Sequence, residues 1–132
     1  MLNQITQERH LQWLKKRIAM SKVTNTKIVE DIVVIATEGY LNKDLGEEIQ
    51  NIAQKYIDDG SSIFLINLKD SKIVNSIGAS ILIELIEQLQ DIDGQLVFCD
   101  LAPIIEKTFK IMGLTKYCKV YPTEDEAVKE LA

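Results

Sequence analysis

A short apolar run followed by an amphipathic helix constrains the fold of this chain more than any other feature. Residues 62–67 read SIFLIN, a nearly continuous run of branched and aromatic side chains that is typical of a strand covered on both faces. Farther along, apolar residues recur at helical spacing, at Ile81, Leu82, Leu85, Leu89 and Ile92. The two patterns predict a buried strand joined to a helix, the repeating unit of α/β folds.

The same alternation runs along most of the chain. We predict strands at 27–30 and 32–37 around a tight turn at Glu30 and Asp31, and further strands at 63–68, 95–100 and 117–121. Helices are predicted at 43–58, 76–91 and 103–112, and a last helix after Pro122 begins with acidic residues. Because helical crossovers imply parallel pairing, we expect an α/β domain around a mixed, mostly parallel sheet.

Two connections of this predicted sheet, at 37–43 and 69–78, follow the carboxyl ends of strands, where open α/β sheets carry their chemistry. Ser76 lies where the second connection meets the helix. We expect Asn75 or Ser76 to cap the free N–H groups of that helix, Ser76 to be exposed, and Asn42 and Asn75 to flank it. The same N–H groups and the positive end of the helix dipole would stabilise a phosphoryl group on Ser76.

The composition is that of a globular domain. Of the 132 residues, 46% are hydrophobic and 27% are charged. No apolar run approaches the roughly 18 residues that span a bilayer, and the N-terminus lacks the apolar centre of a signal peptide. We therefore expect a cytoplasmic protein. Cys99 and Cys118 fall in predicted strands and are expected to be buried thiols.

No catalytic or cofactor-binding pattern is recognisable in the sequence. The one histidine, His10, offers neither a Ser-His-Asp arrangement nor a zinc site with the cysteines. Phosphate-binding loops of the Gly-x-Gly-x-x-Gly or Walker type are not found. We predict that the protein is not an enzyme and holds no cofactor or metal.

Charge is unevenly distributed along the chain. The net charge is −5, but residues 1–22 carry five basic side chains against Glu8, so this extension is +4 and the remainder is −9. An acidic domain repels nucleic acid and anionic membrane surfaces. We predict a basic protein surface as its partner and no direct binding of nucleic acid.

Residues 1–22 form an N-terminal extension with an amphipathic pattern. Leu11, Leu14 and Ile18 recur at helical spacing, with Trp13 beside them and a basic cluster at 15–17. Three interpretations compete: a helix packed on the domain or on a second copy, a basic anchor for a membrane or a partner, or a disordered leader. We favour the packed helix, which would form a homodimer if the docking is reciprocal, because the extension has too much apolar surface for a free tail.

Three short motifs resemble one known family. Asn75-Ser76-Ile77-Gly78 resembles the Asp-Ser-Ser/Thr-Gly loop of the STAS domains, the anti-sigma-factor antagonists. Residues 38–42 (EGYLN) resemble the Gly-Glu-Leu-Asp turn of that family, and residues 111–116 (IMGLTK) resemble its Gly-Leu segment before the last strand. The resemblance covers about residues 23–132, which we expect to form a STAS domain after the extension 1–22.

This resemblance implies a fold, a modification and a partner. Helices should cover mainly one face of the sheet. An unphosphorylated antagonist binds an anti-sigma factor or switch protein kinase, and phosphorylation of its loop serine, here Ser76, abolishes that binding. The partner-binding residues that the motif implies are Asn42, Asn75, Ser76, Ile77, Gly78 and Ser80.

Two positions depart from the family pattern, because Asn75 and Asn42 replace aspartates. Both substitutions remove a negative charge while keeping a hydrogen-bonding side chain. Two functions therefore stay open: a phosphorylation-controlled antagonist with altered partner specificity, or a non-phosphorylated scaffold subunit of a lipid-transport ATPase or stress-sensing complex. A small hydrolase or nucleotide-binding protein is the third and least favoured hypothesis.

Overall fold

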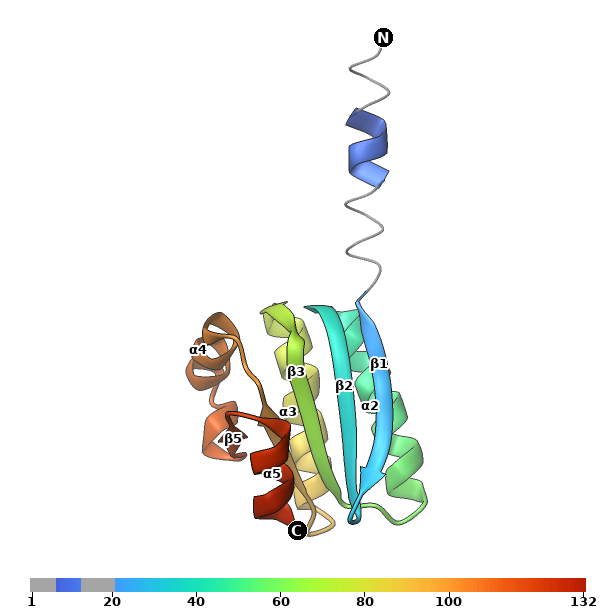
Figure 1. Cartoon of the computed structure of the whole chain (residues 1–132), viewed down its shortest axis with the longest axis vertical. Coiled ribbons are helices and arrows are strands. Elements are labelled where there is room, and N and C mark those ends of the chain that lie inside the picture. The colour runs from blue at the N-terminus through green and yellow to red at the C-terminus, as the bar shows by residue number, and fades with distance from the viewer. Residues whose placement is uncertain (1–6, 13–20) are drawn as a thin grey trace.

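A sheet of five strands lies at the centre of the residues that the computed structural model describes, 7–12 and 21–132. The strands are arranged side by side in chain order (Figure 1): β1 (Lys22–Val29), β2 (Ile32–Leu41), β3 (Ile63–Val74), β4 (Gln95–Cys99) and β5 (Val120–Tyr121). β1 is antiparallel to β2, and the other neighbouring pairs are parallel. The predicted mixed, mostly parallel sheet is confirmed.

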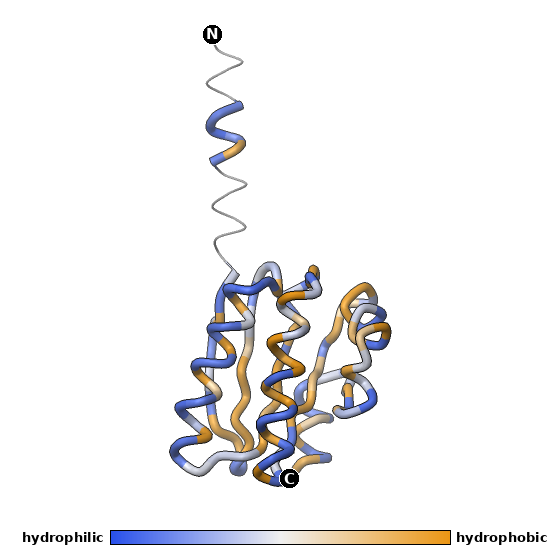
Figure 2. Tube along the Cα trace, turned by 180° about the vertical axis from the view of Figure 1, so that it is seen from behind, coloured by the Kyte–Doolittle hydropathy of each residue, from blue (hydrophilic) through white to orange (hydrophobic). Residues whose placement is uncertain are grey.

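The helices cover the two faces of the sheet unequally. α2 (Lys43–Asp58), α3 (Ser76–Gln90) and α4 (Pro103–Met112) contribute to one apolar cluster, whereas α5 (Glu124–Leu131) packs on the opposite face. Seen from behind, α2 and α3 alternate between hydrophilic and hydrophobic turns in front of hydrophobic strands (Figure 2). The expectation of helices mainly on one face is therefore also confirmed.

Side chains of the central strands alternate between the two apolar clusters, because successive residues of a strand point to opposite faces. In β3, Phe64 and Ile66 join the cluster under α2, α3 and α4, while Leu65 joins the cluster under α5. All three side chains are fully buried. The run 62–67 reads as continuously apolar for this reason, since both faces of β3 are covered.

The strands extend farther than the sequence predicted. β2 and β3 continue side by side into the expected connections 37–43 and 69–78, pairing Tyr40 with Ile73 and Leu41 with Val74. Ser71 points inward, where its hydroxyl shares a 2.7 Å hydrogen bond with that of Thr37, and both residues are buried. A satisfied polar pair costs little to bury, so a polar run that resembles a loop stays in the sheet. β1 likewise begins at Lys22 rather than at 27.

The prediction of a last strand at 117–121 is mostly wrong. Gly113 adopts a left-handed conformation with φ of 86° and ends α4, and a 3₁₀ helix, η1 (Leu114–Lys116), follows it. Only the two residues of β5 remain as strand. Cys118 therefore lies outside any strand, although it is buried and its Sγ donates to the carbonyl oxygen of Leu114 at 3.0 Å.

Both cysteines are buried free thiols, as predicted. Burial raises the pKa of Cys118 to about 12 and raises the pKa of Cys99 well above its usual range. Buried thiols that stay protonated at neutral pH are poor nucleophiles and poor metal ligands.

The N-terminal extension is described only in part. Residues 7–12 are helical and exposed, whereas Trp13, Leu14 and Ile18 lie outside the described residues. Among the residues that are described, no helix is both long and apolar enough to cross a membrane.

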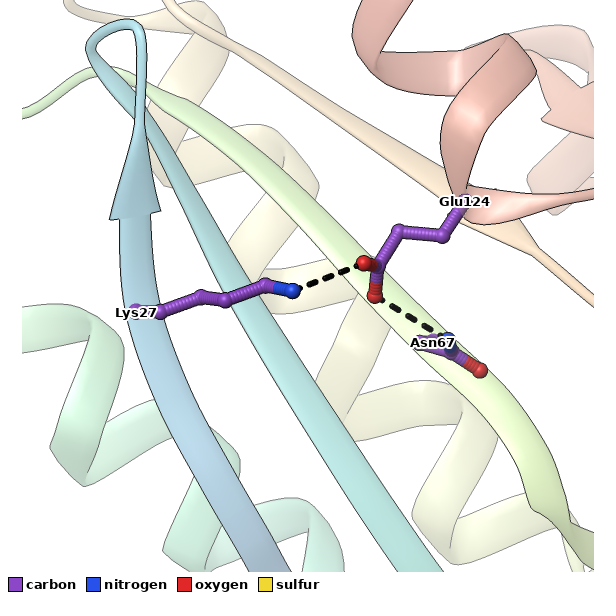
Figure 3. Close-up of polar contacts among 3 residues, drawn as sticks. All are labelled: Lys27, Asn67 and Glu124. Atoms are coloured by element: carbon purple, nitrogen blue, oxygen red, sulfur yellow. Dashed lines mark hydrogen bonds and ion pairs between the residues drawn. The ribbon is translucent and has the colours of Figure 1, made fainter.

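A polar contact joins α5 to β1 and β3 on the face of the sheet that α5 covers (Figure 3). The Glu124 carboxylate accepts hydrogen bonds from the Lys27 ammonium group on β1 at 2.9 Å and from the Asn67 amide on β3 at 3.1 Å. Burial alone would raise the pKa of Glu124, but these two hydrogen bonds and the charge of Lys27 outweigh it and lower the pKa.

Glu124→Gln tests this contact through the pH dependence of stability. A carboxylate with a lowered pKa contributes stability above its ordinary pKa of 4.5 and loses that contribution as the pH falls through the folded-state value. We expect wild type to exceed Glu124→Gln in unfolding free energy by less than about 1 kcal/mol at pH 7, because the side chains are partly exposed. In urea denaturation the difference should shrink toward pH 3. Glu126→Gln, which changes an exposed side chain in the same helical turn, is the matched control and should stay within about 0.5 kcal/mol of wild type at pH 7.

Candidate functional site

Asn75 separates β3 from α3 and starts the helix. Its backbone is extended, with φ of −109° and ψ of 169°, and its Oδ1 accepts a hydrogen bond from the Gly78 N–H at 2.8 Å. Asn75 is therefore the N-cap, and Ser76 is the first helical residue. The expectation that α3 opens on Ser76 is confirmed, whereas a capping role for the Ser76 hydroxyl is wrong. The side chain of an extended residue just before a helix can reach the free backbone N–H groups of the first turn. Asn75, and not Ser76, occupies that position.

Asn42 occupies the same position between β2 and α2. Its backbone is also extended, and its Oδ1 accepts from the Leu45 N–H at 3.1 Å. The two asparagines thus perform the same task at neighbouring strand ends. Because a carboxamide oxygen accepts this hydrogen bond as a carboxylate oxygen would, capping at both positions needs no negative charge.

The two helix starts are packed against each other. The Asn75 N–H donates to the Leu41 carbonyl oxygen at 3.1 Å, so the second connection is tied to the first. A Cβ added to Gly78 would lie 2.4 Å from the same oxygen, closer than real contacts allow. Gly78 is buried and offers no side chain to a partner. Its place in the motif is explained by this close approach of α3 to the end of β2.

Ser76 is exposed to solvent, in contrast to the buried Gly78. Within the described part of the chain its hydroxyl makes no hydrogen bond, while its carbonyl oxygen accepts one from the Ser80 hydroxyl at 2.7 Å. Ser80, one turn farther along α3, is also exposed. The Ser76 hydroxyl is thus accessible to a modifying enzyme.

Electrostatics at the helix start favour an anion. The first turn of α3 contains no acidic residue. The positive end of the helix dipole is therefore not offset by a carboxylate on the helix itself. A phosphoryl group on Ser76 would lie at this end of the helix.

Two exposed isoleucines flank the serine in the chain. Ile77 is 53% exposed and Ile73, near the end of β3, is 61% exposed. The sequence motif indicated Ile77 but missed Ile73, because residues 69–74 were read as a loop. The Ile73-Val74 pair directly before the helix was the available signal of a strand end. Ile77 thus adds exposed apolar surface directly after the Ser76 hydroxyl in the chain.

The described residues provide no metal site beside Ser76 or elsewhere. Among them, no group of three or more His, Cys, Asp or Glu side chains could hold a metal ion.

Comparison with known proteins identifies relatives of this arrangement. The sequence profile of the STAS domain matches residues 23–127, which confirms the resemblance predicted from the three motifs. The protein BtrV of Bordetella bronchiseptica, named as an anti-sigma factor antagonist, is 24% identical over 101 residues. That match covers 76% of this chain and 84% of BtrV.

Solved structures show the same fold. The structure of TM1081 from Thermotoga maritima, also named as an anti-sigma factor antagonist, superimposes with a TM-score of 0.74 at 19% identity, covering 80% of this chain and 92% of that chain. The phosphorylated form of SpoIIAA, a Bacillus cell fate determinant, superimposes with a TM-score of 0.67 at 21% identity, covering 82% and 98%.

Gly78→Ala tests the packing beneath Ser76. A methyl group against the Leu41 carbonyl must displace backbone, so we expect the unfolding free energy to fall by about 1–3 kcal/mol in urea denaturation. Ser80→Ala changes an exposed side chain of the same helix and should stay within about 0.5 kcal/mol of wild type. Equal stability of the two variants would contradict the close approach of Gly78 to the Leu41 carbonyl oxygen.

Proposed function

We propose, because the chain belongs to the STAS domain family, that it is an anti-sigma-factor antagonist in a partner-switching pathway controlled by phosphorylation of Ser76. Its partner is an anti-sigma factor or a switch protein kinase. In this proposal the protein is a cytoplasmic binding module and not an enzyme. The relatives named as antagonists support the class of function.

The observation that carries the proposal is the position of Ser76. Its hydroxyl is exposed at the first helical residue of α3, on a base packed firmly by Asn75 and Gly78. A kinase can therefore reach the hydroxyl without unfolding its surroundings, and the phosphate would be accommodated at the helix start. Modification should change binding rather than the fold.

Phosphorylation acts through charge and hydration. It adds about −1.5 to −2 charges at neutral pH together with strongly hydrated oxygens. Ile77, which directly follows Ser76 in the first turn of α3, adds exposed apolar surface at the same helix start. A partner that covers this helix start and desolvates Ile77 must also desolvate the phosphate, which costs far more than covering a hydroxyl. Unphosphorylated protein therefore binds and phosphorylated protein is released.

The two asparagines are compatible with this switch. Asn75 and Asn42 keep the capping hydrogen bonds without placing a carboxylate near the future phosphate. The acidic remainder of the chain is suited to a partner with a basic surface. The second candidate, a scaffold subunit that is never phosphorylated, would use the same exposed surface constitutively.

Mass spectrometry of protein from native cells separates the two candidates. Phosphate on Ser76 under at least one growth condition supports the switch. Its absence under all conditions, including stress and entry into stationary phase, would favour the scaffold.

Ser76→Asp should abolish partner binding without loss of fold. Aspartate is well tolerated in the first turn of a helix, so the unfolding free energy should change by less than about 1 kcal/mol. The affinity of the variant for its anti-sigma factor or switch kinase, measured by calorimetric titration, should fall at least about tenfold. Asn51→Asp places the same charge at an exposed position of α2, outside the partner-binding residues that the motif implies, and is the matched control. An equal loss in both variants would mean that Ser76 has no special role.

Asn75→Asp should alter the rate of phosphorylation of Ser76 by the purified kinase. The substitution is nearly isosteric and preserves the cap, so stability should be unchanged in thermal unfolding. The added negative charge beside the acceptor changes the electrostatics of phosphoryl transfer. Identical rates for the two proteins would show that the asparagine serves only as a cap.

A further inference from the structure

A shallow groove runs between the edge strand β1 and helix α2, away from Ser76. It consists of two adjoining hollows of about 390 and 380 Å³ that share Thr26 and Ile52. Its apolar floor is formed by three half-buried residues that also pack against the main core, Val23, Ile52 and Tyr56. Glu48 and Asp59 contribute acidic side chains to its lining, and Lys55 contributes a basic one. We call this feature the β1–α2 groove.

An uncovered isoleucine extends the floor of this groove. Ile28 pairs with Val33, whose side chain belongs to the core under α2, so Ile28 points to the helix-covered side of the sheet. Nevertheless it is 58% exposed. Among residues 7–12 and 21–132, β1 has a strand neighbour on one side only, so the other edge of this surface is open as well. The groove and Ile28 together form an apolar strip that is open to solvent in the described part of the chain.

The charge of α2 defines what would fit the strip. Residues 43–59 carry five acidic and two basic side chains, a net charge of −3. An occupant with apolar residues on one face and basic residues on another would satisfy both the floor and the rim.

The N-terminal extension has this composition. Leu11, Leu14 and Ile18 recur at helical spacing beside Trp13, and residues 8–18 carry a net charge of +3. The extension joins the domain at Ser21, next to the groove residue Val23. Its apolar pattern and its charge are both complementary to the β1–α2 groove.

The extension is poorly placed to enter the groove of its own chain. The Ser21 hydroxyl accepts a hydrogen bond from the Tyr40 N–H at 2.7 Å, which fixes the start of β1. To reach its own groove the extension would have to reverse direction just before this point. Residues 13–20 contain no Gly, Pro, Asn or Asp to make such a turn, and the helical residues 7–12 are exposed.

We propose that the β1–α2 groove binds residues 8–18 of a second copy of this chain, and that reciprocal exchange of the two extensions forms a twofold dimer. The dimer interface is separate from the Ser76 surface. The proposal therefore stands independently of the switch function.

Sedimentation equilibrium of the full chain over a micromolar concentration series tests this proposal, with Trp13 fluorescence as a second readout. Trp13 is the only tryptophan, so its emission reports directly on the extension. We expect a dimer mass at high concentration and a blue shift of the emission that follows the same concentration dependence. A monomeric mass at every concentration would overturn the proposal. A blue shift that is independent of concentration in a monomer would also do so, since it would place the extension in its own groove.

Ile28→Asp should raise the dimer dissociation constant at least about tenfold, because it places a charge on the apolar strip. Ile92→Asp is the matched control, since Ile92 is 46% exposed but lies in the turn after α3, outside the groove. Equal dissociation constants of the two variants would overturn the proposal. Thermal unfolding of both variants establishes that they are folded.

A charge exchange gives a test that does not depend on Ile28. Glu48→Lys should weaken the dimer, and adding Lys16→Glu to the same chain should restore it, because the opposite charges are then exchanged between groove and extension. If the double variant dimerises no better than Glu48→Lys alone, the extension does not bind beside Glu48.

Discussion

The first turn of α3 rests directly on the backbone of Leu41, and the end of the sheet that carries Ser76 depends on this contact. The Leu41 carbonyl oxygen accepts from the Asn75 N–H and leaves no room for a side chain at Gly78. One carbonyl thereby sets the distance between the end of β2 and the start of α3. A rigid base of this kind lets the residue above it be exposed and still well positioned.

The residues of the motif 75–78 have different roles because of this contact with Leu41. Asn75 and Gly78 are structural, because one caps the helix and the other allows its close approach, whereas Ser76 and Ile77 are directed to solvent. In the proposed switch, a phosphoryl group on Ser76 would change what binds to the surface without changing how the surface is built. A switch that acts on binding alone requires this separation.

The opposite face of the sheet is closed by a different kind of interaction. α5 covers an apolar cluster around Leu65 and Val97, and the contact of Glu124 with Lys27 and Asn67 links the helix to the edge strand β1 and the central strand β3. Lys27 is thereby held over the sheet instead of extending from its edge. Such inward-directed charges discourage unwanted pairing of edge strands. The side of β1 that faces α2, with Ile28 and the β1–α2 groove, is then the part of this edge that a partner can contact.

The sequence by itself determined the α/β class, the start of α3 at Ser76, the acidic start of α5 and the burial of both cysteines, because periodicity and local capping rules depend on near neighbours in the chain. It did not show that residues 69–74 continue β3, since the inward place of Ser71 depends on Thr37, far away in the sequence. The choice of Asn75 over Ser76 as cap was decided by the extended backbone at the end of β3. The exposure of Ile73 was decided by its place in β3, where its neighbour Val74 packs against the core and Ile73 points to the other face. The Glu124 contact likewise unites residues from three elements. Each of these features arises from pairing between distant segments, which only the tertiary structure specifies.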